Sequence, residues 1–421
     1  MSRSLLFRGN VVLPDHVMHS GGVLVRDGRI AAVDRASSLA AAADSQTVVV
    51  DAPAGGYISP GFVDIHVHGG LGADFMDGTA ESYRTALISH ARHGTTSLTP
   101  TTTVARHEQI MAVLKLTREF MARRETGDQR QQTNPKPAIR NPQSEILPNV
   151  LGAHFYGPYF RYEARGAHPG AAIRPPIEQE FNEYLEYADA LATATVAPEL
   201  PNAEAFARAC VAKGVRMNTG HSWATFEQMR EAVGWGVRHI DHLFCAMSDK
   251  TRLRQFQCFP MQGGVLEATL YFDELTTEVI ADGKHLSRDL LELALKIKGV
   301  DRLALVSDCS RALDMPDGEY LIGPLDGGEP IVRRDGVGQL PDGTALGSSI
   351  MALDHMVRTF IELTGRPLWE VIRMASLTPA RIIGRDGELG SLAPGKRADV
   401  VVLDQSLEVQ RVFIGGEEFS S

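Results

Sequence analysis

A chain of 421 residues, 43% hydrophobic and 22% charged, is long enough for one α/β barrel with a small accessory domain and has the composition of a globular protein. Its formal net charge of -10, without a Lys/Arg run that interleaves with aromatic residues, argues against nucleic-acid binding and favours a small-molecule substrate. We also expect no membrane association, a cytoplasmic location and reduced thiols, because the sequence has neither a long apolar run nor a CxxC pair.

Both ends of the chain are predicted to form short β-strands. In residues 1–57, apolar and polar positions alternate in short runs that Gly and Asp interrupt, which is typical of β-hairpins. Residues 386–421 repeat this style, with a buried strand in ADVVVLD and a hairpin around Gly415 and Gly416. We therefore predict that 1–57 and 386–421 together form a small β-sandwich domain.

Residues 58–385 alternate strand-like and helical segments, which predicts βα units, a parallel sheet and an α/β fold of the (β/α)₈ TIM-type barrel class. A polar, proline-bearing stretch at about 121–147 is predicted to be a surface loop. The eight expected strands lie at 58–68, 95–103, 149–157, 192–199, 215–222, 238–244, 278–285 and 302–309.

Histidines and one aspartate stand where these expected strands end. His66 and His68 are two positions apart, so their side chains project from the same face of the first barrel strand. His221, His242 and Asp308 stand at or near the ends of the fifth, sixth and eighth expected strands. Because barrel enzymes place their active sites at this rim, the five side chains predict a catalytic divalent-metal site. Imidazole and carboxylate ligands favour Zn²⁺, with Fe²⁺, Mn²⁺ or Co²⁺ as alternatives.

Several longer segments carry a family resemblance. The sequence resembles the amidohydrolase superfamily and, within it, the N-acetylglucosamine-6-phosphate deacetylases over nearly its whole length. The resemblance implies a metal-dependent barrel that hydrolyses a carbon–nitrogen bond, a phosphorylated amino-sugar substrate, and a homodimer. The segments that carry it include PGFVDIHVHGG (60–70), GAHFYGP (152–158), RGAHP (165–169), TGHSWATFEQM (219–229), DHLFCAM (241–247), IADGKH (280–285), LVSDC (305–309) and ALGSS (345–349).

One position departs from the family pattern. Where the deacetylases have His-x-Glu-Gly-Pro, with the glutamate as a metal ligand, this chain has Tyr156. A phenol with an ordinary pKa near 10 is a poor ligand. We therefore predict one metal ion rather than two, held by His66, His68, His221 and Asp308 in the manner of the superfamily's deaminases. His242 would then be a catalytic group or lie just outside the ligand set, and Tyr156 would donate a hydrogen bond to the substrate.

The predicted chemistry is metal-assisted hydrolysis. The cation would activate a water molecule and polarise the scissile carbonyl, while Asp308 would accept the proton and return it to the leaving amine.

The resemblance also implies substrate contacts. His168 and His285 match family positions, Cys245 and Ala246 stand where the family has Asn-Ala, and Leu346 belongs to the same predicted pocket. A phosphate would require an arginine, for which the sequence offers Arg252 or Arg254.

Two other functions compete with deacetylation of N-acetylglucosamine 6-phosphate. Tyr156 and Cys245 both alter the predicted pocket, which favours an amidohydrolase of different specificity, such as a deaminase or another amide hydrolase. A non-catalytic sugar-phosphate-binding homologue is the third hypothesis, although it would have no need of the HxH pair or Asp308.

Overall fold

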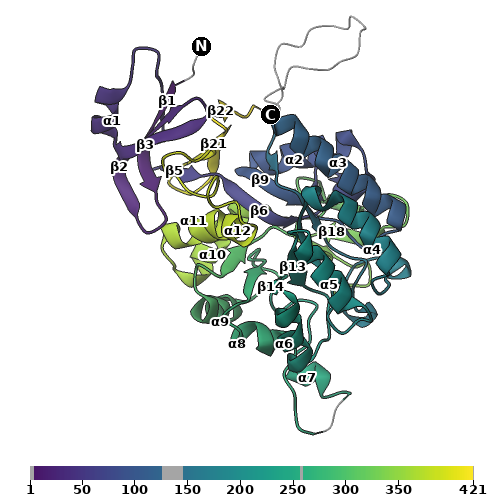
Figure 1. Ribbon diagram of the computed structural model, residues 1–421. Coiled ribbons are helices and arrows are strands. Elements are labelled where there is room, and N and C mark those ends of the chain that lie inside the picture. The colour runs from purple at the N-terminus through teal and green to yellow at the C-terminus, as the bar shows by residue number, and fades with distance from the viewer. Residues whose placement is uncertain (1–3, 126–145, 257–258, 421) are drawn as a thin grey trace, which may run out of the picture.

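The computed structural model describes residues 4–125, 146–256 and 259–420 (Figure 1). Most of the predicted loop at 121–147 lies outside these residues, and positions 121–125 belong to helix α3 (His107–Glu125). Cys258 also lies outside them, whereas Cys210, Cys245 and Cys309 are free thiols. No described helix combines the length and apolar content that a bilayer crossing requires.

The two ends of the chain share one eight-stranded sheet. Its order is β22-β21-β20-β5-β1-β2-β3, with β4 paired to β1. In Figure 1 the yellow C-terminal strands lie beside the purple N-terminal ones, and the antiparallel β5–β20 pair joins the two groups. The predicted hairpin at Gly415 and Gly416 is present between β21 and β22. The strands are β1 (Ser4–Val12), β2 (Val17–Arg26), β3 (Arg29–Arg35), β4 (Val48–Asp51), β5 (Tyr57–Pro60), β20 (Val400–Leu403), β21 (Val409–Ile414) and β22 (Glu417–Glu418).

The first expected barrel strand, 58–68, is divided in two. Residues Tyr57–Pro60 pair with β20 in the terminal sheet, and a new strand, β6 (Phe62–Val67), begins after Gly61. A Cβ on Gly61 would lie 2.1 Å from Thr96 Oγ1, so only glycine fits at this junction. The continuous apolar run concealed the boundary, because the strands on both sides of it are buried.

Parallel strands carry the central part of the chain. One sheet has the order β10-β9-β6 and the other β11-β12-β13-β14-β15-β16, all parallel. A bridge between Thr101 and His154 joins the two sheets at one seam, and Asp308 N–H donates to His66 O at the other. These strands are β6, β9 (Thr95–Pro100), β10 (Asn149–Val150), β11 (Ala153–Phe155), β12 (Leu191–Thr195), β13 (Arg216–Thr219), β14 (Val237–Ile240), β15 (Thr276–Val279) and β16 (Leu303–Leu305).

Helices follow most of the parallel strands and pack around them (Figure 1). Helix α9 ends at Lys298 with Gly299 as its C-cap, and α2 ends at Arg92 with His93 as its C-cap. The helices are α1 (Ala36–Ala42), α2 (Ala80–Arg92), α3, α4 (Glu178–Tyr184), α5 (Ala203–Ala212), α6 (Phe226–Trp235), α7 (Lys250–Leu253), α8 (Val265–Tyr271), α9 (Arg288–Lys298), α10 (Leu353–Thr364), α11 (Leu368–Ala375) and α12 (Leu377–Ile382).

Two small antiparallel sheets, which the sequence analysis did not anticipate, lie at the carboxyl ends of the parallel strands. The larger consists of β17 (Gly318–Ile322), β18 (Glu329–Arg334) and β19 (Val337–Gln339). Its buried Ile322 and Ile331 pack with Ala167 and Ile350. The smaller, β7 (Gly69–Gly70) and β8 (Ala73–Asp74), follows β6 directly. The larger sheet therefore encloses one side of the space above the parallel strands.

A charged cluster of His93, Asp314 and Asp354 joins the end of α2 to the start of α10. His93 Nε2 lies 2.9 Å from Asp314 and Nδ1 lies 3.2 Å from Asp354, the latter at the start of α10. Burial opposes a charge on His93, but the two carboxylates outweigh it and raise the pKa of His93 to about 10.

This pKa predicts how stability depends on pH. A histidine whose pKa is raised by folding stabilises the folded state fully below its unfolded value, near 6.5, and the stabilisation declines as the pH approaches 10. We therefore expect His93→Gln to lower the free energy of unfolding most at pH 6, with a difference that shrinks steadily toward pH 10. Urea unfolding at both pH values measures this, and a difference independent of pH would contradict it.

Candidate active site

A pocket of about 430 Å³ opens at the carboxyl ends of the parallel strands, which is a size typical of small-molecule sites. Most residues singled out from the sequence line it. Those present are His68, Tyr156, His168, His221, His242, Cys245, Ala246, Arg252, His285, Asp308 and Leu346, and the other lining residues include Glu163, Ile280, Ile322 and Ser348.

Three of the predicted metal ligands meet below this pocket. Asp308 Oδ1 lies 3.3 Å from His68 Nε2 and 3.6 Å from His66 Nε2. One potential ligand atom from each of the three residues lies within 4.8 Å of the others. Both histidines are fully buried, and Asp308 retains 8% exposure toward the pocket. Asp308 is therefore in contact with the two imidazoles and still accessible to a bound molecule.

The charges of this cluster stabilise one another. Burial opposes protonation of His66, but Glu278 and Asp308 outweigh it and raise the pKa of His66 to about 9. Burial also opposes ionisation of Asp308, yet His66, His68 and His242 hold the pKa of Asp308 well below its usual value. Asp308 is consequently a carboxylate at neutral pH.

The donor set of this cluster fits a divalent cation. His66 Nε2 is buried and has no hydrogen-bond partner among the described residues, and its nearest ion-pair contact is Asp308 at 3.6 Å. A buried nitrogen rarely lacks a partner, and two imidazoles with one carboxylate form a common ligand set for Zn²⁺ and related metals.

The other two predicted ligands form a separate group. His221 Nδ1 donates to the backbone oxygen of Ala164 at 2.7 Å, so His221 Nε2 carries a lone pair. This Nε2 lies 3.2 Å from His242 Nε2, and Tyr156 Oη lies 2.5 Å from the same atom of His242. The predicted five-ligand set is thus divided between His66, His68 and Asp308 on one side and His221 with His242 on the other.

Tyr156 acts as a neutral hydrogen-bond donor in the second group. Burial and the carboxylates of Asp241 and Asp308 hold the pKa of Tyr156 well above its usual value. Burial, with His66, lowers the pKa of His242 to about 4. A neutral phenol beside a neutral imidazole donates its proton to the free nitrogen, so Tyr156 donates to His242 Nε2.

Backbone strain concentrates at these residues. His221, His242 and Asp308 have φ values of 47°, 22° and 46°, in the region that non-glycine residues seldom adopt. Ala246 and Ser348, which line the same pocket, have φ values of 50° and 70°. Such strain persists only where the surrounding structure enforces it, and it is typical of functional sites.

The predicted substrate contacts surround the opening. His285 Nδ1 lies 2.8 Å from Asp282, whose carboxylate accepts its hydrogen and leaves Nε2 free to accept another. Burial raises the pKa of Cys245 to about 12, so its side chain is a neutral thiol. Arg252 is one of the residues that line the pocket, whereas Arg254 is not.

Sequence reasoning missed three polar residues around this site. Ser348 donates to the backbone oxygen of Asp308, and Glu278 and Asp241 are buried beneath the pocket. The available signal was a charged residue, Glu278, within the short strand β15, whose sequence is TTEV. A charged residue in a central strand is seldom buried without a partner.

The comparisons with known proteins define the class of this chain. The model of the amidohydrolase family matches residues 57–419. The chain belongs to the amidohydrolase family.

Within the amidohydrolase family, the chain is similar to deacetylases of N-acetylated amino-sugar 6-phosphates. The chain is 34% identical to N-acetylgalactosamine-6-phosphate deacetylase of Escherichia coli O157:H7, over 86% of this chain and 87% of the relative. It is 30% identical to N-acetylglucosamine-6-phosphate deacetylase of Bacillus subtilis, over 97% and 95% of the two chains.

Solved structures of N-acetylglucosamine-6-phosphate deacetylases are also similar to this chain. An aspartate-to-alanine mutant of N-acetyl-D-glucosamine-6-phosphate deacetylase from Mycobacterium smegmatis, in complex with N-acetyl-D-glucosamine-6-phosphate, has a TM-score of 0.82, 27% identity and full coverage of both chains. The N-acetylglucosamine-6-phosphate deacetylase from Pasteurella multocida has a TM-score of 0.85 at 25% identity, also with full coverage.

The group formed by His221 and His242 has no carboxylate, which leads to a prediction about metal binding. Tyr156→Glu places a carboxylate beside His221 and His242, whereas the matched control Tyr156→Gln adds a side chain of similar size without a charge. We expect the Glu variant to bind about one more metal ion per chain than the Gln variant, because carboxylate is the missing ligand type. Elemental analysis after dialysis counts the ions, and equal counts in the two variants would contradict the prediction.

Proposed function

We propose that the chain is a metal-dependent hydrolase that removes the N-acetyl group of an amino-sugar phosphate. The observation that carries the proposal is the meeting of His66, His68 and Asp308 below a pocket that also contains Arg252. The relatives that match most of the chain bear the names of deacetylases of N-acetylated amino-sugar 6-phosphates.

We propose one divalent ion, with Zn²⁺ favoured by the ligand types, held by His66, His68 and Asp308. A cation there would polarise the amide carbonyl and make water more acidic. His221 and His242 would not share a second ion in this arrangement. Tyr156 occupies the space between the two groups, with its ring centroid 4.5 Å from that of His66 and 5.3 Å from that of His221.

Asp308 is the proposed proton carrier. Its low pKa keeps it ionised before the reaction, and its exposed fraction faces the pocket. It would accept a proton from the attacking water and return it to the amine, because an amine leaves poorly unless it is protonated. Tyr156, whose hydroxyl lies 2.5 Å from His242 Nε2, would turn its hydrogen bond from that nitrogen to the carbonyl oxygen and so stabilise the negative charge that develops there.

Arg252 is the proposed phosphate contact. It stacks over Trp223, with its guanidinium carbon 5.0 Å from the ring centroid, and it lines the pocket. A guanidinium at a pocket is suited to bidentate phosphate binding. The relatives act on both N-acetylglucosamine and N-acetylgalactosamine phosphates, so both sugars belong in the assay.

We propose that the two parallel sheets form one closed (β/α)₈ barrel, supported by the hydrogen bonds at both seams. We assign residues 58–385 to it, and 1–57 with 386–421 to a β-sandwich domain built on the terminal sheet. The homodimer and the cytoplasmic location stay predictions.

A second candidate function is hydrolysis of a different amide or amine. Cys245 and Ile280 make part of the pocket wall apolar, and a thiol cannot provide both the donor and the acceptor of an amide side chain. Activity toward other acylated amines, without activity toward the two sugar phosphates, would favour this candidate. Tight sugar-phosphate binding without hydrolysis would favour the non-catalytic homologue.

We expect the metal-supplemented protein to release acetate from N-acetylglucosamine 6-phosphate or N-acetylgalactosamine 6-phosphate. Asp308→Asn should lower kcat by about 10³-fold or more, because it removes the proton acceptor and a charged ligand. Acetate assay with each substrate measures this, and an Asn variant of unchanged kcat would refute the role.

We expect Arg252→Ala to raise KM for the phosphorylated sugar about 10–100-fold, the loss expected from one charge-assisted contact. The unphosphorylated sugar should be affected far less. Arg254→Ala, an exposed neighbour outside the pocket, is the matched control. Equal effects of Arg252→Ala on both sugars would show that Arg252 does not hold phosphate.

A further inference from the structure

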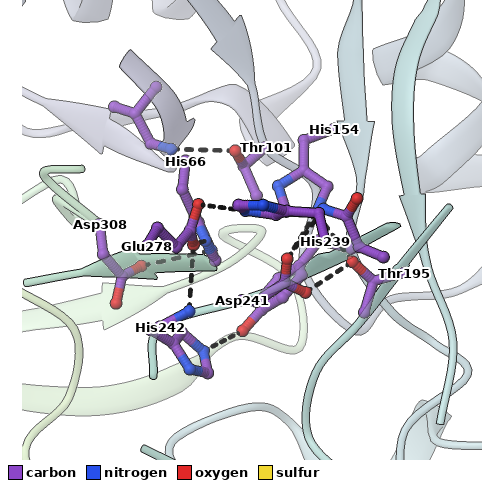
Figure 2. A network of polar contacts seen from close by, with 12 residues as sticks. His66, Thr101, His154, Thr195, His239, Asp241, His242, Glu278 and Asp308 are labelled. Carbon is purple, nitrogen blue, oxygen red and sulfur yellow. Dashed lines mark hydrogen bonds and ion pairs between the residues drawn. The ribbon is translucent and has the colours of Figure 1, made fainter. Parts of the chain in front are cut away.

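A buried network of polar side chains adjoins the proposed metal site and includes His66 and Asp308 (Figure 2). Its centre is Glu278 on β15, which is 1% exposed. Glu278 Oε1 lies 2.5 Å from His66 Nδ1 and accepts from the backbone N–H of His242 at 3.2 Å. Its other oxygen, Oε2, lies 3.1 Å from His239 Nε2. One carboxylate thus contacts both histidine groups of the pocket and a third histidine below them.

This network has the residue types of a second cation site, because potential ligand atoms of His66, Asp241 and Glu278 also lie within 4.8 Å of one another. Protein donors already satisfy its oxygens, however. Asp241 accepts from Asn218 at 2.8 Å and from Thr195 at 2.7 Å, and both oxygens of Glu278 have the partners given above. The contacts therefore favour a hydrogen-bonded network over a second ion.

The contact with Glu278 determines which nitrogen of His66 keeps its hydrogen when the other binds a metal. A carboxylate accepts only, so the short contact places a hydrogen on Nδ1. His66 Nε2, on the other side of the ring, is then the nitrogen available to a metal, and it is the one nearest Asp308. Glu278 is itself held by His239, whose Nδ1 lies 2.8 Å from Thr276 Oγ1. The chain of contacts fixes both the tautomer and the orientation of His66.

We propose that Glu278 is a positioning residue that presents His66 Nε2 to the metal ion and makes His66 a stronger ligand. The proposal rests on the metal centre proposed above. A carboxylate that accepts the second N–H of a ligating imidazole orients the ring and raises its basicity. Because Glu278 also accepts from the backbone N–H of His242, it holds β6 and the end of β14 in a fixed relation.

The test uses Glu278→Gln, which keeps the shape and one acceptor oxygen but removes the charge. The matched control is Asp64→Asn, which removes another fully buried carboxyl from the same strand as His66. Asp64 accepts from the backbone N–H groups of His66 and Ser307, and an asparagine oxygen can replace it there. The imidazole of His66 keeps its contact with Glu278 in this control.

The readout is Zn²⁺ affinity, measured by competition with a chelator on full-length protein whose folding is verified by circular dichroism. We expect Glu278→Gln to bind Zn²⁺ about 10–100-fold more weakly than the wild type, and Asp64→Asn to bind within about threefold of it. A change in the visible spectrum of the Co²⁺-substituted Gln variant would accompany the loss. Wild-type affinity in a folded Glu278→Gln protein would overturn the proposal.

A measurement on the wild type covers the case in which the variant does not fold. In ¹⁵N-histidine NMR of the Zn²⁺-loaded protein, we expect His66 to carry its proton on Nδ1 and to coordinate through Nε2. Coordination through Nδ1 would overturn the proposal even without the variant. If the wild type bound no metal at all, the proposed function itself would fail, and that result is distinct from equal affinities of the wild type and the Gln variant.

Discussion

The imidazole of His66 lies between two carboxylates, and the arrangement of the whole site depends on this pair of contacts. Glu278 lies 2.5 Å from Nδ1, and Asp308 lies 3.6 Å from Nε2. In a buried site these charges are far from water, so each must be balanced by its neighbours. The balance keeps Asp308 ionised at the floor of the pocket, where a hydrolytic reaction requires a proton acceptor.

The same balance explains why the five expected ligands are divided. The carboxylates contact the ring nitrogens of His66 and His68, whereas the ring nitrogens of His221 and His242 contact each other, a backbone oxygen and the phenol of Tyr156. A cation is stabilised most by the group of side chains that carries negative charge, which is His66, His68 and Asp308. Tyr156 adds no charge to the His221 and His242 group, so the proposed cation favours the HxH side of the pocket, and the phenol is a hydrogen-bond donor near the proposed position of the substrate carbonyl.

Much of this site was predictable from the sequence, and the rest was not, for physical reasons. The position of His66, His68 and Asp308 at strand ends follows from the two-residue period of strands and the placement rule for barrels. The role of Glu278 does not, because its partner His66 is 212 residues away and spacing carries no information about such a contact. Sequence patterns likewise missed β17–β19, and they merged β5 with β6 because both strands are buried.

The most direct test of this account is the position of the metal in a crystal of the Zn²⁺-loaded protein, located by anomalous scattering. The account predicts one strong peak within bonding distance of His66, His68 and Asp308, and none between His221 and His242. A peak bound by His221 and His242, with the HxH pair empty, would contradict it.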